Sequence, residues 1–282
     1  KGKVIIPIIY DDAYEISGGK IKMILNGQPV YFDLSGKKIA GQEVVVTNPV
    51  YTEDVASKGA KIATAMAEKN DYVNKGNIKF NRKDYAGAVK DYDQELELNP
   101  KNVIVYSYRG LARQQLLDFT GAIKDFNKYI ELNPQDANAY TNRGASKCSL
   151  KDYSGAILDF NKTIELDSTN SLAYLNRGKV KNILNENMSA IHDFNKILEF
   201  NPQYIEAYLG RGVSEYWLKD YMGAIQDFTK VIELDPNHGL AFSNRGQAAI
   251  MLGEKNKGCP DLKKALGLGH TPAADLIKQY CD

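Results

Sequence analysis

The most constraining feature of this sequence is a set of residues that recurs every 34 positions. The first column is aromatic and comprises Tyr72, Tyr106, Tyr140, Tyr174, Tyr208 and Phe242. Four residues later a glycine column comprises Gly76, Gly110, Gly144, Gly178, Gly212 and Gly246. A third column comprises Asp91, Asp125, Asp159, Asp193, Asp227 and Asp261. A fixed period of this length predicts a repeat architecture, here six units from residue 69 to residue 272.

Each unit has the pattern of two antiparallel helices. In the third unit, residues 137–170, segment 138–150 predicts one helix and segment 153–166 a second, with apolar residues at helical spacing. Lys151 and Asp152 form the expected turn between them. Sister units end in Asn-Pro, as at Asn133 and Pro134, and proline ends helices because it lacks an amide hydrogen and restricts the preceding residue.

The hairpin explains the recurring residues when positions are counted from the start of each unit. If the chain turns near position 15, the glycine at position 8 faces the alanine at position 20, as Gly144 would face Ala156. A helical glycine costs about 1 kcal/mol relative to alanine, so close approach of the two helices is the expected compensation. Position 7 carries Arg109, Arg143, Arg177, Arg211 and Arg245, with Lys75 in the first unit. We predict that each pairs with the aspartate of its own unit, and phosphate binding is the alternative interpretation.

The spacing of these residues resembles the tetratricopeptide repeat. One unit matches the aromatic, glycine, alanine, aromatic and proline positions of that repeat with Tyr106, Gly110, Ala122, Phe126 and Pro134. Departures occur at Ser168, which replaces proline, at Asn187, which replaces an aromatic, and at Gly258, which replaces alanine. The resemblance covers residues 69–272 and implies a mainly α fold, a right-handed α-solenoid of six helix–turn–helix units with a capping helix.

The N-terminal part differs in kind from the repeats. Residues 1–45 contain the β-rich stretches "VIIPIIY", "KIKMILNG" and "VYFDLSGKKI", with hairpin signals at Asn26-Gly27 and Ser35-Gly36, which predict a small antiparallel β-meander. The pattern resembles the bacterial WG β-repeat, although Pro29-Val30 replaces its Trp-Gly. Residues 46–68 are interpreted as a linker and a helix that follows Thr52. The missing initial methionine and the lack of a signal-peptide pattern favour a processed or truncated product.

At the C-terminus, residues 260–282 predict short capping helices. Pro260 and Pro272 suit first helical turns. Two antiparallel helices there would bring Cys259 near Cys281, so a disulfide is one interpretation and two free thiols the other. A disulfide would add about 3 kcal/mol of stability and would favour a periplasmic or extracellular location over the cytoplasm. Cys148 is expected to stay free.

The composition and the motifs exclude several functional classes. The chain has 36 Lys plus Arg against 35 Asp plus Glu, which argues against nucleic-acid binding. No apolar run approaches roughly 20 residues, so membrane association is expected only through partners. The three histidines, His192, His238 and His270, occupy unrelated repeat positions without a second ligand at metal-binding spacing. We therefore predict no catalytic residue, metal, cofactor or small-molecule substrate, and we interpret the recurring acids as structural.

In the tetratricopeptide family, positions 2, 5, 6, 9, 12 and 13 line a concave groove. Position 6 holds Asn142, Asn176 and Asn244, whose amides can either hold an extended peptide backbone or simply be solvated. Positions 9, 12 and 13 of the last three units hold Lys179, Asn182, Ile183, Val213, Tyr216, Trp217, Ile250 and Met251. We predict that these eleven residues bind a peptide or partner segment, and the alternative is that Trp217 packs between helices. Position 5 never holds lysine, which argues against the carboxylate clamp of chaperone-tail binders.

The prediction for function is a non-catalytic protein-interaction module. Its partner is expected to be a protein or peptide held in the groove. The alternative is an architectural component of a cell-envelope or secretion assembly, with contacts outside the groove. An enzyme is not expected.

Overall fold

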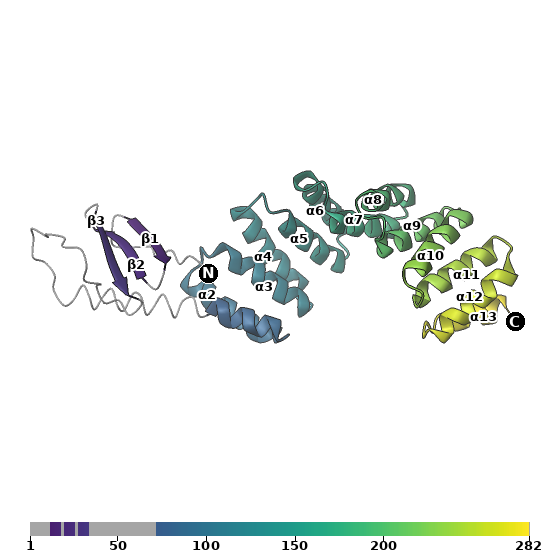
Figure 1. The fold of residues 1–282 in the computed structure, drawn as a ribbon, viewed down its shortest axis with the longest axis horizontal. Helices are drawn as coiled ribbons and strands as arrows, with labels where there is room; N and C mark the ends of the chain where they lie inside the picture. Colours follow the sequence, from purple (N-terminus) through teal and green to yellow (C-terminus); the bar gives the residue numbers. More distant parts are fainter. Residues whose placement is uncertain (1–11, 18–19, 26–27, 34–71, 282) are drawn as a thin grey trace, which may run out of the picture. The chain divides into compact units, whose positions relative to one another are not determined.

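The computed structural model describes residues 12–17, 20–25, 28–33 and 72–281 (Figure 1). The chain divides into two compact units, residues 1–78 and 79–282. The stretch "VIIPIIY", the linker and the helix expected after Thr52 lie outside the described residues, so these predictions stay untested.

The N-terminal unit contains a three-stranded sheet. Its strands are β1 (Asp12–Ser17), β2 (Lys20–Leu25) and β3 (Gln28–Asp33), which pair antiparallel in the order β1-β2-β3. The β2–β3 pair closes with Leu25 opposite Gln28. The register of β1 on β2 shifts between Tyr14 and Ile16. The resemblance of this region to the WG β-repeat stays a prediction.

Residues 72–281 consist of helices joined by short turns, with residues 72–78 in the first unit and residues 79–281 in the second. Residues 72–81 are helical, and twelve named helices follow: α2 (Tyr85–Leu98), α3 (Val103–Gln115), α4 (Phe119–Leu132), α5 (Ala137–Ser149), α6 (Tyr153–Leu166), α7 (Ser171–Ile183), α8 (Asn187–Phe200), α9 (Ile205–Trp217), α10 (Tyr221–Leu234), α11 (Gly239–Met251), α12 (Lys255–Gly267) and α13 (Ala273–Tyr280). Each helix packs on the next one along the chain, and Figure 1 shows the pairs stacked in sequence order. The predicted helices at 138–150 and 153–166 are confirmed to within one residue. None of the described helices is long and apolar enough to span a membrane.

The turn inside each hairpin has one recurring backbone form. A single residue adopts positive φ there, at Lys83, Leu117, Lys151, Asn185, Lys219 and Gly253. In four hairpins the next residue is an aspartate whose carboxylate accepts a hydrogen bond from a backbone amide three residues on, at 2.9–3.0 Å. These are Asp84, Asp118, Asp152 and Asp220, and they cap the second helix of each pair.

The recurring glycine makes room for an aromatic ring. A Cβ atom added to Gly144 would lie 2.7 Å from the ring of Phe160, which is fully buried. The same contact recurs in the pairs Gly110–Phe126, Gly178–Phe194 and Gly212–Phe228. The ring at position 24 therefore fills the space beside the glycine, which the sequence did not predict, and the contact of Gly144 with Ala156 stays a prediction. In the sixth repeat Gly246, at position 8, meets the backbone of Gly258, at position 20, as the predicted close approach of these two positions requires.

The recurring arginine joins two repeats. Arg143 donates through Nε and Nη2 to both carboxylate oxygens of Asp159, at 2.9 and 2.5 Å, and Asp159 is buried. Its Nη1 donates to Oδ1 of Asn127 in the preceding repeat at 2.8 Å. Its guanidinium also lies 5.4 Å from the ring of Tyr140, within cation–π range. Each arginine thus holds its own hairpin and fastens that hairpin to the previous one.

The predicted arginine–aspartate pairs are confirmed in five repeats. They are Arg109–Asp125, Arg143–Asp159, Arg177–Asp193, Arg211–Asp227 and Arg245–Asp261. In the first repeat Asp91 pairs with Lys79 at 2.7 Å. Because each arginine has its own carboxylate partner, which is buried in four repeats and half-buried at Asp261, the phosphate-binding interpretation is not supported.

The C-terminal end departs from the predicted boundaries. Helix α12 begins at Lys255, so Pro260 lies inside it, and α12 is the second helix of the sixth hairpin. The prediction of a helix start at Pro260 is wrong because packing against α11 extends the helix beyond the proline. Only α13 follows as a cap, and a disulfide joins Cys259 to Cys281 with a Cα–Cα distance of 5.7 Å. Cys148 is free and half-buried.

Candidate binding groove

The first helices of the repeats, α3, α5, α7, α9 and α11, form one surface, called here the groove surface. Neighbouring first helices touch directly. Nδ2 of Asn182 in α7 donates to the carbonyl oxygen of Gly210 in α9 at 3.2 Å. The hydroxyl of the fully buried Ser214 donates to Oδ1 of Asn182 at 2.7 Å. The amide of Asn182 is therefore used inside the solenoid, which differs from the predicted role in binding.

These contacts between first helices alternate along the solenoid. Gln114 makes the same kind of bridge as Asn182, with Nε2 donating to the Asn142 carbonyl at 2.8 Å and to the Ser146 hydroxyl at 2.7 Å. In the intervening repeats the equivalent contacts are apolar. Cys148 packs with Val180 in one cluster, and Tyr216 packs with Ala248 in another.

Exposed apolar side chains form a stripe at the C-terminal ends of α7, α9 and α11, the first helices of the fourth, fifth and sixth repeats. Ile183, Trp217 and Met251 occupy the same repeat position and are 57%, 65% and 45% exposed. Gln115 and Ser149 hold this position in the second and third repeats and are exposed and polar. Trp217 therefore does not pack between helices. The stripe distinguishes the fourth to sixth repeats from the second and third.

A cavity of about 160 Å³ lies beside Trp217, between α9 and α11. Its lining consists of Val213, Tyr216, Trp217, Phe228, Asn244 and Gln247. It brings together four of the residues that the sequence singled out. The rings of Tyr216 and Trp217 meet edge to face at 5.8 Å. Burial raises the pKa of Tyr216, so its phenol is neutral at physiological pH and can donate a hydrogen bond.

Two lining residues were missed by the sequence reasoning. Gln247 stands at position 9, the column that also contains Lys179 and Val213, and this shared position could have identified it. Phe228 belongs to the second helix α10, which the family pattern does not place on the groove. It reaches the cavity because Gly212 leaves space for its ring.

The other predicted residues lie outside this cavity. Lys179 is exposed on α7, and Met251 is exposed at the end of α11. Asn142 and Asn176 are half-buried on α5 and α7, and Ile250 is half-buried on α11, where its side chain lies against Gly258. The predicted set is thus a surface that spans several helices, with a cavity at one part of it.

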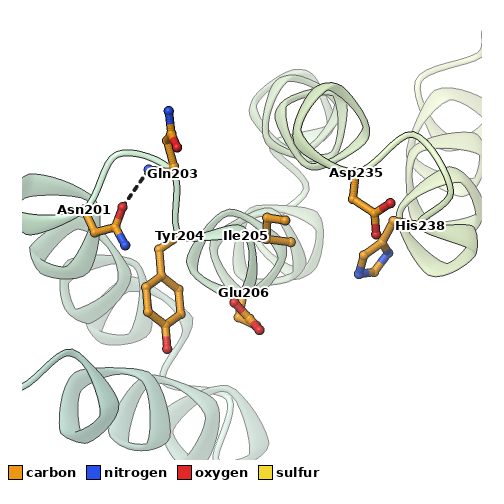
Figure 2. Close-up of a pocket in the computed structure, with 7 residues that line it drawn as sticks. All are labelled: Asn201, Gln203, Tyr204, Ile205, Glu206, Asp235 and His238. Carbon is orange, nitrogen blue, oxygen red and sulfur yellow. Dashed lines mark hydrogen bonds between the residues drawn. The ribbon is translucent and has the colours of Figure 1, made fainter.

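A larger cavity of about 390 Å³ lies at the starts of α9 and α11 (Figure 2). Its lining consists of Asn201, Gln203, Tyr204, Ile205, Glu206, Asp235 and His238. In Figure 2, Asn201, Gln203 and Tyr204 lie on one side of the start of α9, and Asp235 and His238 lie on the other side. The sequence reasoning missed this cavity.

Three of the polar lining residues bond to backbone amides of the turns and helix starts around the larger cavity. Asn201 accepts from the amide of Gln203 at 3.1 Å, and Asp235 accepts from the amide of Asn237 at 3.0 Å. Nδ1 of His238 accepts from the amide of Ala241 at 3.2 Å, as an N-cap of α11. Among the described residues, no group of three His, Cys, Asp or Glu side chains could hold a metal ion.

Models of the tetratricopeptide repeat match residues 73–137 and 205–238 of the chain. A 42-residue segment is 48% identical to the protein named Protein STIP1 homolog from Dictyostelium discoideum. That match covers 15% of this chain, which spans only 7% of that relative's length.

Several solved structures share the fold of the described helices. A tetratricopeptide repeat protein from Parabacteroides merdae is 19% identical, with a TM-score of 0.64 over 71% of this chain and 79% of that one. MamA is 24% identical, with a TM-score of 0.55 over 61% and 94%. YrrB, described as a TPR protein with an unusual peptide-binding site, is 23% identical, with a TM-score of 0.56 over 66% and 97%. The chain therefore contains tetratricopeptide repeats, and its described helices stack as a solenoid of such repeats.

Proposed function

We propose that this protein is a non-catalytic interaction module that binds a peptide segment of a partner protein across α7, α9 and α11. The observation that carries the proposal is the exposed Trp217 beside a cavity lined by aromatic, aliphatic and amide side chains. Exposed apolar patches with polar groups around them usually mark interaction sites. Tryptophan and tyrosine are also the side chains that most often dominate binding energy.

The groove surface carries the two kinds of contact that a peptide needs. Tyr216 and Trp217 offer apolar area for one side chain of the ligand. Asn244 and Gln247 each offer an amide donor and an amide acceptor for its backbone. A solenoid of tetratricopeptide repeats is a typical non-catalytic scaffold, and the likeness to YrrB supports a peptide ligand.

The test compares partner capture by three forms of the chain from native lysate. The groove variant carries Trp217→Ala and Asn244→Ala, and a control carries Leu98→Ala, which removes a 54% exposed apolar side chain from α2. Circular dichroism checks that all forms are folded. We expect a partner that the parent and the control capture and that the groove variant loses at least tenfold, since a hot-spot aromatic contributes about 2 kcal/mol. Equal capture by all three forms would contradict groove binding.

A second candidate function is an architectural role with contacts on the second helices. Exposed apolar side chains occur on three of them in succession, Leu158 on α6, Met188 on α8 and Met222 on α10. A triple variant that replaces these residues with serine tests this role. Capture lost with the triple variant and kept with the groove variant would favour the architectural role.

A further inference from the structure

Positions 2, 5, 6, 9, 12 and 13 of repeats two to six carry almost no charge, and this points to the chemistry of the ligand. We infer that the ligand is an extended segment in which an acidic side chain precedes or follows an apolar side chain by three residues. The inference rests on the proposed function and goes further, because it names the pattern that the groove would recognise.

Among the groove positions of repeats two to six, Lys179 and Glu206 are the charged residues. Lys179 is exposed, and within the described part of the chain no carboxylate pairs with it. Lys181, two residues further along α7, donates instead to the buried Asp193 at 2.8 Å. Lys179 is therefore a cation available to a ligand, and an acidic side chain complements it.

Lys179, Val213 and Gln247 occupy position 9 of α7, α9 and α11, so they follow one another across adjacent helices. Packed helices lie about 8–10 Å apart, and the Asn182 hydrogen bonds show that α7 and α9 are in direct contact. An extended or polyproline II chain advances about 3.1–3.4 Å per residue, so three residues cover about 9–10 Å. Ligand residues that are three positions apart therefore contact successive first helices of the groove.

The ligand residue above Val213 meets the apolar cavity beside Tyr216 and Trp217, which favours an aliphatic or aromatic side chain. The residue three positions away, above Lys179, meets the exposed ammonium group. On the other side, Gln247 offers hydrogen bonds to a polar side chain or to the backbone. The order of Lys179, the apolar cavity and Gln247 along the groove thus specifies ligand side chains that are three residues apart.

The experiment is selection from a displayed library of random nine-residue peptides on the full chain. We expect enriched peptides with an acidic residue three positions from an apolar one. Selection on Lys179→Glu should exchange the acidic preference for a basic one and keep the apolar position. Lys151→Glu, the same charge change on an exposed turn residue outside the groove, should leave both preferences unchanged. Replacing the acid of a selected peptide by serine should weaken its Kd about fivefold at low salt, as for an exposed ion pair.

The outcomes separate this inference from the proposed function. An apolar preference without an acid at the three-residue spacing, or a consensus that Lys179→Glu leaves unchanged, would overturn the inference and leave groove binding intact. A library that yields no peptide dependent on Trp217 would count against groove binding itself.

Discussion

The third and fifth repeats share one hairpin plan but carry opposite charges at the same partly buried position. In the third repeat Nζ of Lys147 lies 2.8 Å from a carboxylate oxygen of Asp159. In the fifth repeat Glu215 takes the place of the lysine and faces Asp227. One buried carboxyl oxygen of Glu215 has no hydrogen-bond partner. Burial first, and then the charge of Asp227, raises the pKa of Glu215 to about 8, against the opposing charge of Arg211.

The comparison shows which contact sets the register of the hairpin. The arginine–aspartate pair has two nitrogen–oxygen contacts in both repeats, at 2.9 and 2.5 Å for Arg143 and at 2.7 Å twice for Arg211. The two hairpins therefore keep the same plan although the cation at position 11 is replaced by an acid. Each repeat of a solenoid contacts only its neighbours, so a local loss of stability can remain local.

The largest expected effect comes from removing the shared aspartate in each repeat. Asp159→Asn would leave Arg143 and Lys147 without a buried carboxylate, and we expect a loss of about 3 kcal/mol in the free energy of unfolding. Asp227→Asn should cost about 1 kcal/mol, because Glu215 can then ionise and pair with Arg211. Urea denaturation followed by circular dichroism measures both. Equal losses in the two repeats would show that Glu215 cannot replace the aspartate.

A smaller effect is expected from exchanging the charge that distinguishes the repeats. Glu215→Lys should raise the free energy of unfolding by about 2 kcal/mol at pH 8, since it restores a charged hydrogen bond to Asp227. The reciprocal change Lys147→Glu should lower it by a similar amount. Urea denaturation of the two variants at this pH is the measurement. A destabilised Glu215→Lys variant would mean that the fifth hairpin has rearranged around its acid.

The same position predicts a dependence on pH. The pKa of Glu215 is raised from its ordinary value of 4.5 to about 8, so the folded chain keeps a proton that the unfolded chain releases. The contribution of Glu215 to the free energy of unfolding therefore falls as pH rises from about 4.5 to about 8, and it levels off above that range. The difference between the parent and Glu215→Gln, measured in urea at several pH values, isolates this contribution. A difference that does not change with pH would contradict it.

The smallest effect is expected where the third and fourth repeats differ in the length of the acidic N-cap side chain and not in its charge. In the third repeat Asp152 caps α6 by accepting from the amide of Gly155 at 3.0 Å. In the fourth repeat Glu186 occupies the cap of α8 and makes no side-chain cap bond. Glu186→Asp should add about 1 kcal/mol of stability, and Asp152→Glu should remove a similar amount. Thermal unfolding measures both, and a neutral Glu186→Asp would show that backbone geometry, rather than side-chain length, prevents the cap.

Much of the hairpin could be predicted from the sequence. The period located the helix pairs, and the sum of positions across the turn placed Arg143 opposite Asp159. The helix pairs and the Arg143–Asp159 contact both depend on residues that are close together in one hairpin. There, helical periodicity and a short turn allow only one way for the two helices to face each other. The same reasoning did not predict that the ring of Phe160 fills the space beside Gly144, because positions in a helix do not say how far a ring extends across the interface.

The candidate site was predictable only in part. Repeat positions put Val213, Tyr216, Trp217 and Asn244 on one surface, and the structure brings them to one cavity. The same positions also nominated Asn182, whose amide is used between α7 and α9. The difference between an available amide and an occupied one depends on the neighbouring repeat.

The sequence by itself therefore determined the repeat, the helix pairs and the charge pairs within them, because these follow from local spacing along the chain. Only the tertiary structure decided how one repeat meets the next. In the structure Nη1 of Arg143 donates to Asn127 of the preceding repeat, and Trp217 remains exposed. The amide of Asn182 forms hydrogen bonds between α7 and α9. The physical reason is that stacking joins side chains from different repeats, and the geometry of that stacking is a property of all the packed helices together.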